Sequence, residues 1–315
     1  MKAKRVLVTG ASGFIGRHSL PALAERGFDV HAVYANSVPD GPGTWHRADL
    51  MDSTQRDQLL REVRPTHLLH LAWYTVHRLY WTSLENLRWV EASLALLRGF
   101  VDNGGQRAVL AGTCAEYDWR YGFCSEEVTP TNPATLYGAS KNALHRVAAA
   151  FARQVGISLA WGRVFFPFGP GEQPDRLVPS VIQSLQGGKP VRCSHGRQYR
   201  DFLYVGDCAE AFAALLESEV EGAVNIASGQ PVTIREVVEM IVAGIRKAGT
   251  VPIEYGSISI AANDPPLLLA DIHRLTHEVG WTPRTDLVEG LRLTIGADWN
   301  LVKRSRVNGP EVEVR

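Results

Sequence analysis

Two side chains near the middle of the 315-residue sequence have types and spacing that suit proton transfer. Tyr137 and Lys141, in the stretch TLYGASK, are four residues apart, so on a helix they share one face. An ammonium group beside a phenol stabilises the phenolate and lowers the tyrosine pKa from about 10 toward neutrality. Such a tyrosine can donate a proton to a carbonyl oxygen or accept one from a hydroxyl. Taken alone, the pattern also fits an ordinary helix start with a half-buried tyrosine and a solvated lysine.

A third candidate, Thr113, follows the apolar run AVLAG. This run predicts a buried strand over residues 108–111, which places Thr113 at the carboxyl end of the strand. A hydroxyl there could hold a substrate oxygen opposite the tyrosine.

A glycine-rich stretch near the N-terminus, TGASGFIG, has the pattern of a turn that binds phosphate. Gly10, Gly13 and Gly16 follow an apolar run at residues 5–9 and begin a helical pattern over residues 15–26. Glycines here permit a sharp turn, close approach of the backbone to a pyrophosphate, and tight packing of helix on strand. The helix N-terminus would present free N–H groups to the phosphates. A glycine-rich turn without a ligand is the alternative, and the strand–turn–helix context favours the cofactor.

The end of the next strand, predicted over residues 30–34, selects between NAD and NADP. An Asp or Glu there would bond the ribose 2′-hydroxyl of NAD. The sequence instead runs from Tyr34 to Asn36 without a carboxylate, and without an arginine that would attract a 2′-phosphate. The missing carboxylate favours NADP over NAD. Further along, Asp49 either caps a helix or bonds the adenine amine.

These candidates need a scaffold, and the first half of the sequence alternates strand and helix patterns. Apolar runs at residues 5–9, 30–34, 68–72 and 108–111 are separated by stretches with helical spacing. Such alternation predicts right-handed βαβ units and an α/β fold with a doubly wound parallel sheet of the Rossmann type. Ligands bind these sheets at the carboxyl ends of the strands.

The alternation loosens after FFPFGPGEQP, at residues 165–174, where prolines and glycines predict a loop and a domain boundary. We expect a Rossmann domain over residues 1–165, with residues 203–229 packing back onto it. A smaller, mixed α/β substrate domain is predicted over residues 166–302. Residues 303–315 lack apolar periodicity and are predicted to form a flexible tail.

The composition argues against several other classes of protein. Lys+Arg and Asp+Glu both number 33 and no basic stripe is present, so nucleic acid is not expected as a partner. No apolar stretch reaches the roughly 20 residues of a membrane helix, and the N-terminus has the pattern of a strand, not of a signal peptide. The four cysteines lack C-x-x-C spacing, which predicts reduced thiols and a cytoplasmic location. No cluster of His, Cys or carboxylates has metal-site spacing, so no metal is expected.

In this order, TGASGFIG, LAGT and YGASK resemble the extended short-chain dehydrogenase/reductase family, in its branch of nucleotide-sugar epimerases, dehydratases and reductases. HLAW, RVFFPFGP, RLVPSVI, RDFLYVGDCAEA, VNIASG and GWTP extend the resemblance over most of the chain. It implies that Thr113, Tyr137 and Lys141 are the catalytic triad. The implied contacts to NADP or NAD are Gly10, Ser12, Gly13, Phe14, Ile15, Gly16, Asn36, Asp49, Leu50, Leu71, Ala72, Tyr137 and Lys141.

The resemblance implies hydride transfer between a nicotinamide and a carbon of a nucleotide sugar. The family's 4,6-dehydratases place an Asp-Glu pair directly after the threonine, where this sequence has Cys114 and Ala115, so dehydration ranks low. We expect a 4-ketoreductase of an NDP-4-keto-6-deoxysugar, because the preference for NADP suits a reductase. The alternative is an NAD-dependent nucleotide-sugar 4-epimerase. A non-catalytic dinucleotide sensor is a third hypothesis, against which the presence of Tyr137 argues.

The expected substrate contacts lie in several separate stretches. Arg200 is a fork donor suited to the nucleotide diphosphate, with a structural ion pair to Asp201 or Asp207 as the alternative. Arg176 is a further candidate of the same kind. Phe166 stands where the family often has an asparagine, which implies a more apolar wall. The full predicted set is Trp73, Cys114, Glu116, Phe166, Arg176 and Arg200.

Aromatic residues are frequent in the run WYTVHRLYWTSLENLRWV. Trp73 could shape a sugar pocket or belong to the core, whereas Trp89 is expected in the core. His70 is expected within a buried strand and not as a ligand. The resemblance also implies a homodimer formed through helices around residues 87–100 and 139–151.

Overall fold

The computed structural model describes residues 4–35, 41–245, 251–260 and 264–297. Two of the sequence predictions, the cofactor contact of Asn36 and the tail at residues 303–315, lie outside the described residues.

A seven-stranded parallel sheet lies at the centre of the fold, with strand order β11-β7-β5-β4-β1-β2-β3. Its strands are rich in buried β-branched and leucine side chains, as expected for a sheet covered on both faces. The strands are β1 (Arg5–Thr9), β2 (Asp29–Tyr34), β3 (Thr44–Arg47), β4 (His67–His70), β5 (Arg107–Thr113), β7 (Ser158–Val164) and β11 (Gly222–Ile226).

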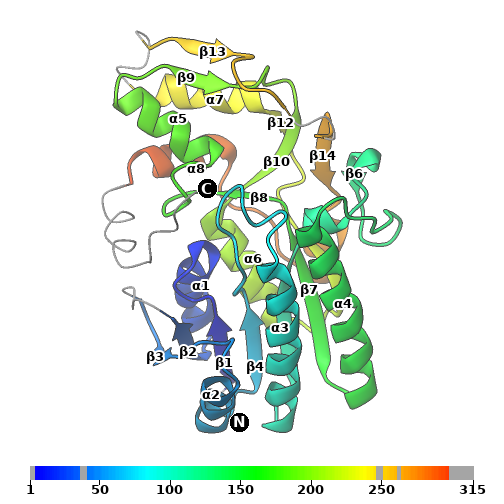
Figure 1. Ribbon diagram of the computed structural model, residues 1–315. Helices are drawn as coiled ribbons and strands as arrows, with labels where there is room; N and C mark the ends of the chain where they lie inside the picture. The colour runs from blue at the N-terminus through cyan, green and yellow to red at the C-terminus, as the bar shows by residue number, and fades with distance from the viewer. Residues whose placement is uncertain (1–3, 36–40, 246–250, 261–263, 298–315) are drawn as a thin grey trace.

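Helices cover both faces of this sheet and form a separate core on each (Figure 1). On one face, α1 (Phe14–Glu25) packs beside α6 (Val205–Glu217). On the other face lie α2 (Ser53–Val63), α3 (Glu85–Asp102) and α4 (Leu136–Val155). The doubly wound Rossmann architecture predicted from the sequence is therefore confirmed.

A second group of elements lies above these layers, on the side toward which β1 and β4 point (Figure 1). Here β10 pairs with β8, β12 and β14, β14 pairs with β6, and β9 pairs with β13. The strands are β6 (Phe123–Cys124), β8 (Phe166–Phe168), β9 (Val191–Cys193), β10 (Tyr199–Tyr204), β12 (Pro231–Thr233), β13 (Ile253–Tyr255) and β14 (Leu267–Ala270). The helices are α5 (Leu177–Gln186), α7 (Ile234–Gly244) and α8 (Leu287–Ile295).

One local prediction is wrong in this region. The stretch at residues 165–174 was expected to be a loop throughout, but it contains β8, which pairs in parallel with β10. Proline interrupts the apolar pattern of this strand, and only its distant partner stabilises it.

The start of α4 is set by local sequence. Thr135 is the N-cap, and its side chain accepts a hydrogen bond from the backbone N–H of Gly138. The helix ends at Gly156, whose φ of 75° is left-handed. Tyr137 therefore lies in the first turn of α4 and Lys141 one turn later.

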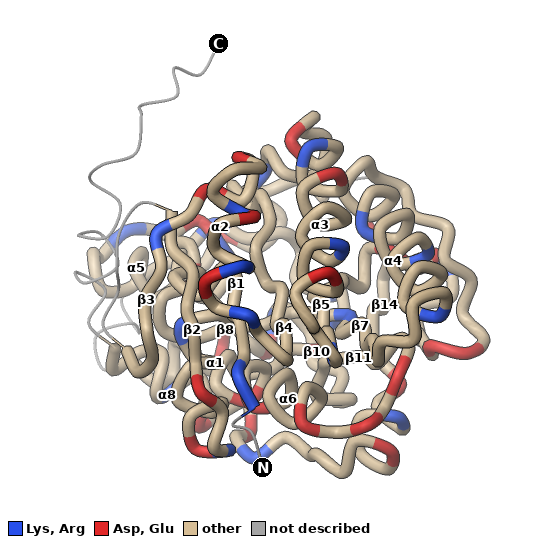
Figure 2. The backbone as a smooth tube through the Cα atoms, turned by 90° about the horizontal axis from the view of Figure 1, so that it is seen from below, with Lys and Arg blue, Asp and Glu red and all other residues tan. Residues whose placement is uncertain are grey.

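Surface charge is mixed, and in Figure 2 basic and acidic residues are interspersed over the helices. Among the described residues, no helix has both the length and the apolar character needed to cross a bilayer.

Candidate active site

The glycine turn between β1 and α1 has a shape that side chains would disrupt. Gly10 has a φ of 66°, and a Cβ there would lie 2.7 Å from the backbone nitrogen of Ala72. A Cβ on Gly16 would collide with the carbonyl oxygen of Gly10. Within the described residues, no side chain caps α1 at Gly13, so its first N–H groups remain donors for an anion. These residues fit the pyrophosphate of a dinucleotide.

Two segments lie beside this turn, one around Pro170 and one after β4, and hydrogen bonds join them to each other. The first segment contacts α1, because the Nε2 of His18 lies 3.0 Å from the carbonyl oxygen of Pro170. The second segment contacts Gly10 through its backbone. Gln173 connects the two, because its Nε2 donates to the Thr75 carbonyl at 2.8 Å and its Oε1 accepts from the His77 N–H at 3.0 Å. We call this pair of hydrogen bonds the Gln173 bridge.

The predicted adenine-side contacts lie beyond β3. Asp49 is exposed, and its Oδ1 accepts from the N–H of Met51 at 2.9 Å. The cap of α2 is Asp52 and not Asp49, so one of the two interpretations of Asp49 is wrong. Its contact to adenine remains a prediction. Leu50 is buried in the core beside α2.

Thr113, Tyr137 and Lys141 come together at the carboxyl end of β5. Thr113 is the last residue of this strand, and its side chain lies near enough to Tyr137 to lower the tyrosine pKa. Lys141 is 3% exposed, and its Nζ donates to the carbonyl of Ala111 at 2.7 Å. The edge of the sheet thus holds a phenol, a hydroxyl and an ammonium close to the phosphate turn.

Three aromatic rings surround Tyr137. The ring centroids of Trp73, Tyr80 and Trp81 lie 6.5, 4.9 and 5.7 Å from that of Tyr137, and the rings meet edge to face. The Tyr137 N–H also donates to the Trp81 carbonyl at 3.1 Å. Tyr80 was missed in the sequence analysis, although the density of aromatic residues in its run was a signal.

The pKa values of Tyr137 and Lys141 differ from those predicted from the sequence. Burial raises the pKa of Tyr137, and the nearby Tyr80 raises it further, while the Thr113 side chain lowers it. The predicted lowering by Lys141 is wrong for this structure, because the ammonium is directed at Ala111 and Trp73. Burial lowers the pKa of Lys141 to about 7, opposed by the Glu116 carboxylate. The site therefore contains a neutral phenol and a lysine that titrates near neutrality.

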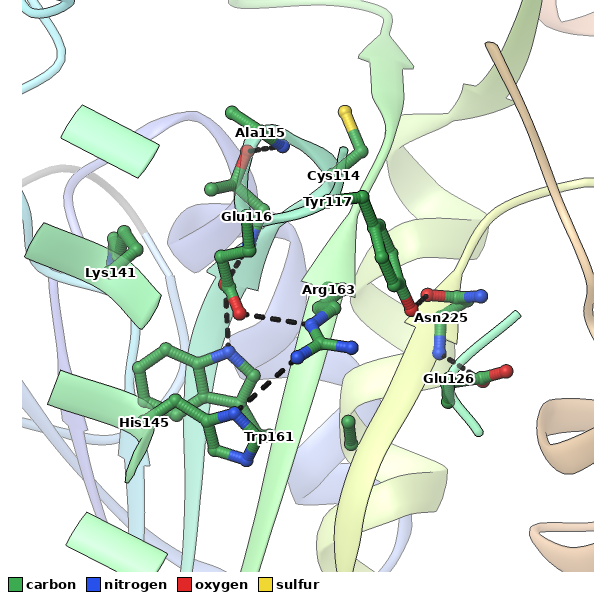
Figure 3. Close-up of polar contacts among 12 residues, drawn as sticks. Cys114, Ala115, Glu116, Tyr117, Glu126, Lys141, His145, Trp161, Arg163 and Asn225 are labelled. Atoms are coloured by element: carbon green, nitrogen blue, oxygen red, sulfur yellow. Dashed lines mark hydrogen bonds and ion pairs between the residues drawn. The ribbon is translucent and has the colours of Figure 1, made fainter. Parts of the chain in front are cut away.

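Glu116 belongs to a buried network of hydrogen bonds, and its predicted contact with the substrate stays a prediction. It is 0% exposed, and its oxygens accept from the Thr113 N–H at 2.8 Å, the Trp161 Nε1 at 2.9 Å and the Arg163 Nε at 2.9 Å. Figure 3 shows its carboxylate directed at Trp161 and Arg163, with Lys141 to one side. Trp161 and Arg163 are two residues apart on the buried strand β7, so their side chains share one face. An arginine in a buried strand is a signal of an internal ion pair.

The remaining predicted substrate contacts lie at different places around the upper part of the molecule. Cys114 is buried, and burial raises the pKa of its thiol. Phe166, in β8, packs against Phe202 with ring centroids 6.0 Å apart. Arg176 precedes α5, and its guanidinium lies 5.4 Å from the centroid of the Tyr80 ring.

Arg200 is already paired within the chain. It is 5% exposed; its Nη2 lies 2.7 Å from the Asp264 carboxylate and its Nη1 donates to the Tyr199 carbonyl at 2.7 Å. The alternative partners named from the sequence are wrong, because Asp201 accepts from the backbone of Ser228 and Asp207 bonds the chain around residues 284–285. A diphosphate contact would have to share this guanidinium with Asp264.

His70 lies within β4 as predicted, and its two ring nitrogens lie 2.6 Å from Thr9 Oγ1 and 2.8 Å from Ser93 Oγ. Across the part of the chain that the structure describes, no cluster of three or more His, Cys, Asp or Glu could hold a metal ion.

Comparison with known proteins identifies relatives along nearly the whole chain. Residues 6–227 match the model of the NAD dependent epimerase/dehydratase family. The fold is similar to MoeE5 in complex with UDP-glucose and NAD, with 34% identity, coverage of 96% of this chain and 99% of that one, and a TM-score of 0.81. It is also similar to the UDP-glucose 4-epimerase of Thermus thermophilus in complex with NAD, with 30% identity, 92% and 97% coverage, and a TM-score of 0.79. The dTDP-4-dehydro-6-deoxyglucose reductase of Escherichia coli is 24% identical over 303 residues, which are 91% of this chain and 95% of that protein.

Proposed function

Because the chain belongs to the NAD-dependent epimerase/dehydratase family, we propose that it interconverts the C4 epimers of a nucleotide-linked hexose. The observation that carries the proposal is the convergence of Thr113, Tyr137 and Lys141 at the strand end beside the phosphate turn. The six predicted substrate contacts remain part of this proposal. Arg176 and Arg200 bind the diphosphate, and Phe166 lines an apolar wall.

Each member of the triad has a distinct task. Bound NAD would supply a hydride acceptor and donor at the nicotinamide ring. Tyr137 accepts the proton of the C4 hydroxyl as C4 is oxidised, and returns it to the carbonyl oxygen when hydride re-enters on the other face. Thr113 hydrogen-bonds the same oxygen. Burial favours the neutral phenol that donates a proton, and the Thr113 side chain favours the phenolate that accepts one.

Epimerisation is proposed ahead of the ketoreduction expected from the sequence, because it returns the cofactor to its starting state. The Gln173 bridge joins the two segments beside the phosphate turn, which supports retention of one cofactor molecule over many turnovers. A reductase must release its cofactor in each turnover. The similarity to an epimerase holding NAD supports the same choice.

Ketoreduction of an NDP-4-keto-6-deoxysugar with NADPH is the second candidate. It is favoured by the absence of a carboxylate where β2 ends at Tyr34, and by the similarity to the reductase of Escherichia coli. Dehydration is disfavoured, since Cys114 and Ala115 carry no acid or base and Glu116 is held in its network.

Two assays on the full-length protein separate the candidates. Purified protein is incubated with UDP-glucose and with UDP-glucuronate plus NAD, and proton NMR follows the anomeric and H4 signals of the C4 epimers. A parallel reaction with NADPH and a dTDP-4-keto-6-deoxysugar is followed by loss of nicotinamide absorbance. Epimer formation without net cofactor consumption supports the proposal. Steady consumption of NADPH, with no epimer formed, assigns the second candidate instead.

A further inference from the structure

The ammonium of Lys141 lies against the face of an aromatic ring. Its Nζ is 3.8 Å from the centroid of the Trp73 ring, while the same atom donates to the Ala111 carbonyl. Since the lysine side chain is almost wholly buried, water does not solvate this charge. A cation placed over an indole at this distance is attracted by the negative face of the ring, and most strongly where water is excluded.

The orientation of the indole is set by a buried amide. Trp73 Nε1 donates to Asn86 Oδ1 at 2.9 Å. Asn86 is 0% exposed, and its Nδ2 donates to the carbonyls of Tyr80 at 2.7 Å and Ser83 at 2.8 Å. Both ends of the amide are therefore occupied, which fixes which end accepts from the indole. The ring cannot turn away from Lys141 without breaking a buried hydrogen bond.

We propose that Trp73 is a positioning residue, whose indole, held by Asn86, keeps the Lys141 ammonium charged and aligned at the proton-transfer site. The inference rests on the proposed function in one respect, namely that Lys141 serves that site. It assigns Trp73 a role that acts through the lysine, in addition to its predicted contact with the substrate.

The other groups around Lys141 leave its charge sensitive to the contact with the Trp73 ring. Glu116 from the turn after β5 favours the charged form, and His70 from β4 also faces the lysine. Burial lowers the pKa of His70 to about 3, so this imidazole is neutral at pH 7. Tyr137, one turn earlier on α4, is a neutral phenol. With the lysine titrating near neutrality, the aromatic face strongly influences whether it is charged at physiological pH.

The test measures the pKa of Lys141 directly, without substrate. The full-length protein is labelled with ¹⁵N and ¹³C in lysine, Lys141 is assigned through Lys141→Arg, and its side-chain signals are followed against pH. Trp73→Leu removes the aromatic face and should lower the pKa of Lys141 by roughly one unit, a tenfold change in its protonation ratio. Trp73→Phe keeps a ring face but loses the hydrogen bond to Asn86. The pKa of Lys141 in this variant should lie between its values in the wild type and in Trp73→Leu.

Trp89→Leu is the matched control. Trp89 packs on Trp73 with ring centroids 6.1 Å apart, and removing it deletes an indole from the same cluster without uncovering the ammonium. The inference is overturned if Trp73→Leu, folded by circular dichroism, leaves the Lys141 titration unchanged, or if Trp89→Leu moves it equally. If Trp73→Leu does not fold, Trp73→Phe takes its place, and an unchanged Lys141 titration in that variant overturns the inference.

Activity measurements keep this inference separate from the proposed function. Where the wild-type protein turns over a nucleotide sugar, kcat/KM is lost as pH rises through the pKa of Lys141, and Trp73→Leu moves that limb about one pH unit lower. Absence of turnover in every nucleotide-sugar assay contradicts the proposed function alone, since the NMR titration still supports or overturns the role of Trp73.

Discussion

At the scale of single residues, the proposed mechanism depends on the phenolic hydroxyl of Tyr137. Tyr137→Phe removes one oxygen and leaves the ring among Trp73, Tyr80 and Trp81. Turnover of the sugar should fall by about 100-fold or more, because the proton has no other acceptor at that oxygen. Bound cofactor, measured after denaturation of the protein, should be unchanged. Full activity in this variant would remove the tyrosine from the mechanism.

For Glu116 we expect substitution to reduce stability, in contrast to Tyr137, where it should reduce activity. Glu116→Gln leaves the Arg163 guanidinium buried without a counter-charge, and should cost about 3–5 kcal/mol in the free energy of unfolding. Urea titration followed by fluorescence measures the loss. Glu289→Gln, which breaks an exposed ion pair to Arg292, is the control and should have little effect. A folded Glu116→Gln protein with normal stability and a raised KM would support the substrate role predicted from the sequence.

At the scale of elements, sequence patterns predicted the strands and helices that local interactions determine. They missed the pairings and contacts that depend on residues far apart in the sequence. β1, α1 and the strand ending at Thr113 were found because their apolar runs and glycine turn are local signals. The order of the motifs predicted that Thr113, Tyr137 and Lys141 lie together, and their catalytic roles stay a prediction. The pairing of β8 with β10, and the contacts of Glu116 and Trp73, depend on segments that only the fold brings together.

The Gln173 bridge is one such contact, and it can be tested at this scale. Gln173→Ala removes both hydrogen bonds, so hydrogen–deuterium exchange should accelerate at residues 75–80. Dissociation of bound cofactor should become roughly tenfold faster. Gln58→Ala, which removes an exposed bond to Glu62 on α2, serves as the control. Unchanged exchange at residues 75–80 would show that the bridge does not hold this segment.

At the scale of the whole molecule, the buried carboxyl of Glu172 links stability to pH. Glu172 lies next to the Gln173 bridge and is 9% exposed, and its Oε2 has no hydrogen-bond partner among the described residues. Burial raises the pKa of Glu172 to about 8, only partly opposed by the charge of Arg176. The folded protein therefore binds this proton more tightly than the unfolded chain, whose carboxyl has a pKa of about 4.3.

The sign of the effect follows from that difference. Below about pH 4 the carboxyl is protonated in both states and contributes nothing, whereas above pH 8 the folded state must bury a charge. The free energy of unfolding should therefore fall as pH rises from about 5 to 8. Glu172→Gln removes this dependence and should stabilise the protein by about 2–4 kcal/mol at pH 8, and by less at pH 5. Urea titrations at both pH values, with Glu25→Gln as an exposed control, measure the difference. Equal stabilisation at the two pH values would mean that Glu172 ionises in the folded protein as it does in the unfolded chain.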